Sequence, residues 1–106
     1  MEIKIYVVTT KLNNPQQHLS LLKNKVDLIK LFNGLTEDKT TKKGYWIDSK
    51  NKIDCDKVIT WTILTTSEDL KKNLTEFEKI INSIKVLTVQ ESQLYTLNPE
   101  IKAFFV

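Results

Sequence analysis

The chain has 106 residues, a length at which one domain can bury a single hydrophobic core. Its 41% hydrophobic and 27% charged residues are ordinary for a globular protein and exclude a disordered one. All sixteen basic residues are lysine and the net charge is only +3. The chain therefore lacks the arginine fork that reads guanine and phosphate, and we expect no specific nucleic-acid interface.

The first third of the chain predicts a strand and then a helix. Residues 3–9 alternate with a period of two and are rich in β-branched side chains, as in a strand. Asn14 and Pro15 are typical of a helix start, and apolar residues then recur at helical spacing. Gly34 suits a left-handed helix end. We expect the helix to end there and a polar loop to run from Gly34 to Gly44.

The middle of the chain predicts a hairpin and a second helix. Residues 44–48 and 57–65 have the character of strands, with a turn between them. Residues 66–69 combine capping hydroxyls with acids, which is typical of a helix start. Apolar residues then follow at steps of four and three, and we expect this helix to end between Ile84 and Val89.

The C-terminal part predicts two short strands, at residues 93–97 and 101–106, around an Asn-Pro-Glu turn. This order is that of a ferredoxin-like βαββαβ domain of the α+β class, with an antiparallel sheet, two helices on one face and a possible extra C-terminal strand. We assign residues 1–106 to one such domain.

The face of the sheet away from the helices is expected to be half apolar. It would carry Tyr6, Val8, Val58, Thr60, Thr62 and Leu64. A half-apolar open face commonly packs against another subunit or holds a ligand. We therefore expect a homo-oligomer.

Two threonine pairs, at residues 9–10 and 65–66, end the two central strands of this arrangement. We expect these two strands to be parallel, so that both pairs lie at one edge of the sheet beside helix N-termini, where a modest anion site could form. Simple capping of the two helices is the alternative interpretation.

A candidate ligand site draws on three segments. The polar loop offers hydroxyls between two glycines, although it lacks the spacing of a phosphate-binding loop. Trp46 can stack on a planar ligand or shield a subunit interface, and Gln90 and Glu91 can hydrogen-bond a polar ligand. The predicted ligand-binding residues are Gly34, Thr36, Gly44, Trp46, Gln90 and Glu91. A solvated loop and a polar helix end are the alternative interpretation.

The sequence offers little for catalysis or metal binding. Three aspartates near the hairpin turn lack the spacing and the glycine of a calcium loop, so we expect no metal and no cofactor. Cys55 stands between two of them, which disfavours a reactive thiolate. His18 and Glu91 are the residues that could act as a general base.

Short motifs between residues 32 and 94 resemble a known family. They are Phe32-x-Gly34-x-Thr36, Gly44-x-Trp46 and Gln90-Glu91-Ser92-x-Leu94. Together they are similar to a pattern in the domain of unknown function 3574 family of small bacterial proteins, over about residues 30–97. The resemblance implies no activity, and it singles out the same six predicted site residues.

We therefore expect a small, non-enzymatic binding module in the cytoplasm that acts as a homo-oligomer. Its ligand would be a small polar or anionic molecule or a protein partner, as in a phage-encoded inhibitor of a host protein. The alternative is a small enzyme, an isomerase or hydrolase, with Glu91 or His18 as general base. The single cysteine allows no internal disulfide, and no stretch is long and apolar enough to predict a membrane span.

Overall fold

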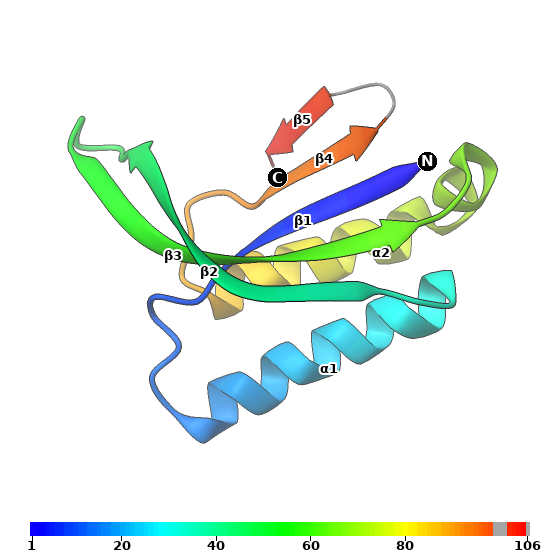
Figure 1. The fold of residues 1–106 in the computed structure, drawn as a ribbon, viewed down its shortest axis with the longest axis horizontal. Coiled ribbons are helices and arrows are strands. Elements are labelled where there is room, and N and C mark those ends of the chain that lie inside the picture. Colours follow the sequence, from blue (N-terminus) through cyan, green and yellow to red (C-terminus); the bar gives the residue numbers. More distant parts are fainter. Residues whose placement is uncertain (99–101, 106) are drawn as a thin grey trace.

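The computed structural model describes residues 1–98 and 102–105, and they form one layered α+β fold (Figure 1). The elements are β1 (Glu2–Val8), α1 (Pro15–Phe32), β2 (Thr36–Ile47), β3 (Ile53–Leu64), α2 (Ser67–Leu87), β4 (Leu94–Asn98) and β5 (Lys102–Phe105). One antiparallel sheet has the strand order β2-β3-β1-β4-β5, and both helices cover the same face of it. The predicted ferredoxin-like fold and its extra C-terminal strand are confirmed. Residues 101 and 106, the ends of the predicted last strand, lie outside the described residues.

The start of α1 follows the sequence prediction, but its end is displaced by one residue. The Asn14 side chain accepts a hydrogen bond from the Gln17 backbone N–H at 2.9 Å, and the Gln17 side chain accepts in return from the Asn14 N–H at 3.3 Å. This reciprocal pair is a capping box. At the other end, the left-handed residue is Asn33, with φ 63°, rather than the expected Gly34. Asparagine tolerates this conformation because its short polar side chain can hydrogen-bond locally.

The segment expected to be a polar loop instead supplies nine of the twelve residues of β2, residues 36–44. The strand begins at Thr36, opposite Thr62, and runs to Ile47, opposite Ile53. A register shift between Asp38 and Lys42 marks a bulge in this pairing. β2 is an edge strand, and hydroxyls and lysines are common on such strands because they discourage pairing with another chain. The segment therefore lacks the apolar alternation that reveals a strand.

The central strands β1 and β3 are antiparallel, with Ile3 opposite Ile63 and Val7 opposite Ile59. The two threonine pairs consequently lie at opposite ends of the sheet. The Thr9 N–H donates to the Lys57 carbonyl at 2.9 Å, whereas the Thr65 N–H donates to the carbonyl of Met1 at 2.9 Å. The expectation of one anion site shared by both pairs is therefore wrong.

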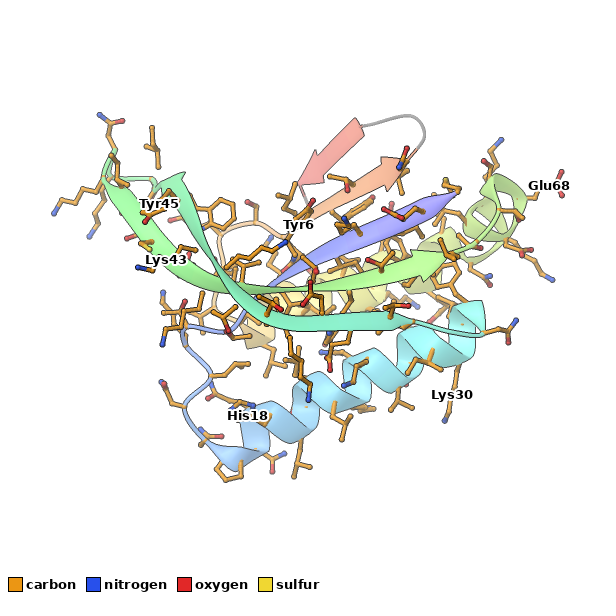
Figure 2. The ribbon with its side chains drawn as sticks, in the orientation of Figure 1. Tyr6, His18, Lys30, Lys43, Tyr45 and Glu68 are labelled. Carbon is orange, nitrogen blue, oxygen red and sulfur yellow. The ribbon has the colours of Figure 1, made fainter. Side chains whose placement is uncertain are left out.

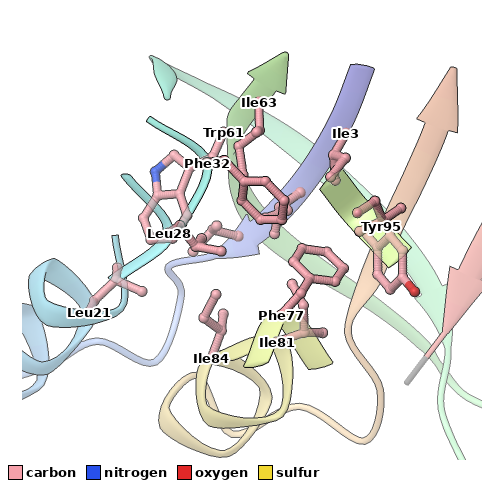
Figure 3. Packing of buried hydrophobic residues seen from close by; sticks show 13 residues of the cluster. Ile3, Leu21, Leu28, Phe32, Trp61, Ile63, Phe77, Ile81, Ile84 and Tyr95 are labelled. Atoms are coloured by element: carbon pink, nitrogen blue, oxygen red, sulfur yellow. The ribbon is translucent and has the colours of Figure 1, made fainter. Parts of the chain in front are cut away.

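The hydrophobic core fills the space between the sheet and the two helices (Figure 3). Phe77 of α2 lies near its centre and makes edge-on ring contacts with Phe32 at 5.8 Å and with Tyr95 at 5.2 Å. Trp61 is 1% exposed, and its indole N–H donates to a Glu37 carboxylate oxygen at 2.8 Å. The core therefore covers the helix-facing side of the sheet, and the opposite side has no helix packed on it.

Neither α1 nor α2 combines the length and the apolar character needed to cross a membrane.

Candidate ligand-binding site

A pocket of about 430 Å³ lies on the side of the sheet opposite to the core. Its lining comes from the end of β1, from the distal half of the β2–β3 hairpin and from the segment between α2 and β4. Figure 1 shows the long hairpin extending beyond the helices, so that this half of it has no helix beneath it. The volume is within the range of small-molecule sites.

The hairpin wall of the pocket is built around Trp46. Its indole N–H donates to a carboxylate oxygen of Asp56 at 2.6 Å, from the neighbouring strand. Gly44 makes room for the ring, because a Cβ atom there would lie 2.5 Å from Cζ2 and 2.9 Å from Cη2 of Trp46. The backbone of Gly44 does not have positive φ, so the glycine supplies space rather than an unusual conformation.

The opposite wall begins at the C-terminus of α2. The Gln90 N–H donates to the Lys85 carbonyl at 3.0 Å and the Val89 N–H to the Val86 carbonyl at 3.2 Å, which is the pattern of a Schellman motif. The left-handed position of this motif is occupied by Val89, with φ 56°. Glycine is usual there, and a β-branched residue is strained. The pocket wall therefore holds a locally strained backbone, a feature that often accompanies functional sites.

A hydrogen bond links the two walls at the hairpin turn. The Ser49 hydroxyl donates to a Glu91 carboxylate oxygen at 2.9 Å. The Gln90 side-chain amide donates to the Thr88 carbonyl at 2.9 Å, and so stays on its own segment. Glu91 is exposed, so the Ser49–Glu91 contact can open without uncovering buried surface.

Carboxylates dominate the charge of the pocket. The charged lining residues are Asp48, Asp54, Asp56, Glu91 and Lys11. Asp48 already accepts from the backbone N–H groups of Lys50 and Lys52, both at 2.9 Å. The Asp54 carboxylate has no hydrogen-bond or ion-pair partner within the described part of the chain. An acidic pocket in a chain of net charge +3 is a local departure from the average surface.

Gln93 is the buried polar residue of the lining, at 1% exposure. Its side-chain N–H group donates to the carbonyls of Tyr6 and, at 3.0 Å, of Leu94. Its carbonyl oxygen Oε1 is buried and has no donor among the described residues. Leaving a buried acceptor without a donor costs about 1–3 kcal/mol.

The structure divides the predicted site residues into two groups. Trp46, Gln90 and Glu91 line the pocket, and Gly44 lies directly under the Trp46 ring. The remaining two, Gly34 and Thr36, lie at the other end of β2, away from the pocket lining. They are separated from Trp46 because the segment is an extended strand, in which ten residues span roughly 30 Å.

The proposed catalytic alternatives are also separated. His18 is exposed on α1 and is absent from the pocket lining, whereas Glu91 is part of it (Figure 2). Within residues 1–98 and 102–105, no three histidine, cysteine or acidic side chains are grouped to hold a metal ion.

The sequence prediction missed Val89 and Gln93 as pocket residues and treated the hairpin aspartates only as a failed metal loop, whereas Tyr6 lies on the open face that was expected to meet a subunit or a ligand. One signal was present for the aspartates. Asp54 and Asp56 are two residues apart on β3, so they share the face that pairs with Trp46. No local signal marks Gln93, because its burial depends on Tyr6 at the other end of the chain.

No protein-family model matches the sequence, and no curated protein matches it significantly. Among solved structures, the chain is similar to a phage SAM lyase in complex with S-methyl-5′-thioadenosine, with a TM-score of 0.68 and 11% identity over 99% of this chain and 87% of that chain. It is also similar to a mutant form of CutA1 from Pyrococcus horikoshii OT3, with a TM-score of 0.48 and 14% identity over 98% and 82% of the two chains. At this level of identity, the likeness to the lyase shows that the two chains share a fold.

Proposed function

We propose that this protein is a homo-oligomeric binding module, acting in the cytoplasm, that holds a positively charged nucleoside of the S-adenosylmethionine type in the pocket described above. One observation carries this proposal: a tryptophan and four carboxylates line a single small-molecule-sized pocket. In a phage-encoded inhibitor, such binding would sequester the ligand from the host.

The charge of the lining favours a cation over the anion expected from the sequence. A unit charge 4 Å from a carboxylate interacts by about 4 kcal/mol near a protein surface, with opposite signs for cations and anions. Asp54 has no competing partner among the described residues, so a ligand cation has no ion pair to displace there.

The nucleoside part of the proposal is supported by the fold. The similar phage SAM lyase holds S-methyl-5′-thioadenosine, a neutral nucleoside thioether. S-adenosylmethionine is the corresponding sulfonium, and its amino-acid chain adds one ammonium and one carboxylate group, so the molecule is a net cation. A planar base can stack on an aromatic ring such as Trp46, while the sulfonium and ammonium groups lie near the carboxylates of the lining.

Calorimetric titration with three ligands tests this proposal. We expect S-adenosylmethionine to bind at least about tenfold more tightly than S-methyl-5′-thioadenosine, since one favourable charge contact is worth a kcal/mol or more. ATP, an anionic nucleotide, should bind most weakly. The substitution Asp54→Asn should remove much of the preference for the cation, whereas Asp69→Asn, on the exposed start of α2, should leave it unchanged. Tighter binding of ATP, or no binding of any of the three at millimolar concentration, would contradict the proposal.

The second candidate is an enzyme that uses Glu91 as its general base. It is retained because Glu91 lines the pocket, and the similarity to a lyase would make the reaction a bond cleavage at sulfur rather than an isomerisation or hydrolysis. Mass spectrometry after incubation with S-adenosylmethionine distinguishes the two. Release of S-methyl-5′-thioadenosine that is lost in Glu91→Gln would establish the enzyme, and recovery of intact ligand supports the binding module.

The homo-oligomer is supported by an apolar strip on the hairpin. Tyr45, Ile47 and Ile53 are 65%, 70% and 76% exposed, and Tyr45 and Ile47 lie two residues apart on one side of β2. Isolated hydrophobic residues are common on surfaces, but a contiguous strip favours contact with a partner. Light scattering at tens of micromolar should give a multiple of 12.3 kDa that Ile47→Lys reduces to the monomer. A mass of 12.3 kDa for the unaltered protein would contradict the oligomer.

A further inference from the structure

We infer that the outer side of α1 binds an amphipathic helix of another protein, one whose apolar residues are flanked by aspartate or glutamate. This surface is separate from the pocket, so the inference is independent of the proposed ligand. It begins from four apolar residues of α1 that neither belong to the hydrophobic core nor pack against it. These residues, called the seam below, are Leu19, Leu22, Val26 and Ile29.

The spacing of the seam is that of a helix–helix contact. Its residues follow one another at steps of three, four and three, as do the apolar positions of a coiled coil. On a helix of 3.6 residues per turn they lie within an arc of about 80°. Leu19, Leu22 and Ile29 are 59%, 47% and 38% exposed, and Val26 is half-buried. The helix therefore carries a second apolar stripe besides the one that faces the core.

The charged and titratable residues that flank the seam are all basic. Lys23 and Lys30 lie on one side of it and His18 and Lys25 on the other, at the heptad positions that meet the flanks of a partner helix. Lys25 is paired with Glu37 at 3.2 Å, whereas Lys23 and Lys30 form no ion pair with a described residue. Figure 2 shows Lys30 directed away from the sheet. Acidic flanks on a partner helix would therefore find two lysines available.

These charges disfavour a second copy of α1 as the partner. A parallel pair would set Lys25 of one copy against Lys30 of the other, and an antiparallel pair would set Lys23 against Lys30. Like charges at such positions repel. The one acid of α1, Asp27, lies between the two helices in a shallow hollow that Lys30 also lines, and it is not at a flank position of the seam.

The width of the seam favours a helix over a lipid surface. A helix that lies on a membrane buries a wide apolar face, whereas an arc of about 80° suits one neighbouring helix. The seam cannot be widened by the remaining large apolar residues of α1, because these face the core. The surface therefore matches one acidic amphipathic helix.

Two designed peptides test the inference on the unaltered protein. Both have about three heptads with leucine at the seam positions, and their flank positions carry glutamate in one and lysine in the other. The fluorescence anisotropy of the labelled glutamate peptide should show saturable binding, at least about tenfold tighter than that of the lysine peptide. Equal binding of the two, or no binding of the glutamate peptide at millimolar concentration, would overturn the inference. Binding to phosphatidylserine vesicles without binding of the glutamate peptide would assign the seam to a membrane and overturn it as well.

Charge reversal on α1 separates a specific contact from the net charge of the protein. Lys23→Glu together with Lys30→Glu should invert the preference, so that the lysine peptide binds at least about tenfold more tightly. Lys71→Glu together with Lys72→Glu, the same change on exposed positions of α2, should leave the original preference in place. A preference that survives the reversal on α1, or that the reversal on α2 inverts, would overturn the inference.

The apolar part of the contact is tested by two leucines. Leu22→Gln, in the seam, should weaken the glutamate peptide at least about tenfold, because leucine at such a position is buried by the partner. Leu74→Gln, at a 39% exposed position of α2, should leave the affinity unchanged. Equal effects of the two substitutions would overturn the inference. If Leu22→Gln does not fold, the comparison of the two peptides on the unaltered protein still decides it.

Discussion

Adding one methyl group to Gly44 should disturb the pocket, whereas adding one to Gly34 should not. A Cβ atom on Gly44 would lie 2.5 Å from the Trp46 ring and 3.1 Å from Cγ2 of Val58. Because atoms of real side chains do not approach so closely, the indole must move by about 1 Å or more, and overpacking of this kind costs about 1–3 kcal/mol. The movement also lengthens the 2.6 Å hydrogen bond from Trp46 to Asp56.

The two glycines provide a matched comparison. A Cβ atom on Gly34 would meet nothing within 4 Å, and Gly34 does not have positive φ. Gly34→Ala should therefore be neutral or stabilising by up to about 1 kcal/mol, because alanine has less freedom in the unfolded chain. The two variants differ in position alone, so the contrast isolates the crowding at Gly44.

Urea denaturation and the indole N–H resonances measure this prediction. Gly44→Ala should lose about 1–3 kcal/mol of unfolding free energy and shift the resonance of Trp46 while that of the buried Trp61 stays in place. It should also weaken ligand binding. Equal stability of the two variants, or an unmoved Trp46 resonance in Gly44→Ala, would refute the reasoning.

Three further changes test the framework that positions the site. Burial raises the pKa of Glu37, but hydrogen bonds from Trp61 and Lys25 and the charges of Lys25 and Lys39 together lower it below 4.5. The ionised carboxylate therefore stabilises the fold above that pH, and this stabilisation is lost as the pH falls through the lowered pKa. The difference in unfolding free energy between pH 7 and pH 3, measured in urea, should be smaller in Glu37→Gln than in the unaltered protein, and an unchanged difference would refute this. Val89→Gly should relieve about 1–2 kcal/mol of strain from the left-handed backbone at this position, which exceeds the entropy that glycine loses on folding. The melting temperature should therefore rise, and a lower melting temperature would contradict the strain. Asn14→Ala should lose about 1 kcal/mol in urea by removing the cap of α1, and no loss would show that the cap does not contribute.

The fold was predictable where residues are buried on one face. The alternation in β1 and β3 and the helical spacing in α1 and α2 arise because each element has one side against the core, and the strand order follows from the sequence of elements. The first eight of the twelve residues of β2 were missed, because an edge strand with solvent on much of its surface needs no apolar alternation. The left-handed residue after α1 was misplaced because asparagine and glycine stand next to each other there.

The site was predictable only in part, because it depends on contacts between distant segments. Trp46, Gln90 and Glu91 come together because the hairpin and the segment after α2 lie on the same side of the sheet, which the topology implies. Gln93 could not be found, since it is buried among segments distant in sequence and its side chain donates to Tyr6, 87 residues away. The sign of the ligand charge could not be predicted either, because the hairpin aspartates come close together only when β2 pairs with β3.

In the proposed complex, a cationic nucleoside lies beside Trp46 in the acidic pocket. A titration of isotope-labelled protein with S-adenosylmethionine, followed by nuclear magnetic resonance, tests it most directly. We predict saturable shifts of the Trp46 indole and the Gln93 side-chain amide resonances, with Gly34 and Thr36 unaffected at the other end of β2. Shifts confined to the lysine-rich edge of β2, or no shifts at millimolar ligand, would contradict it.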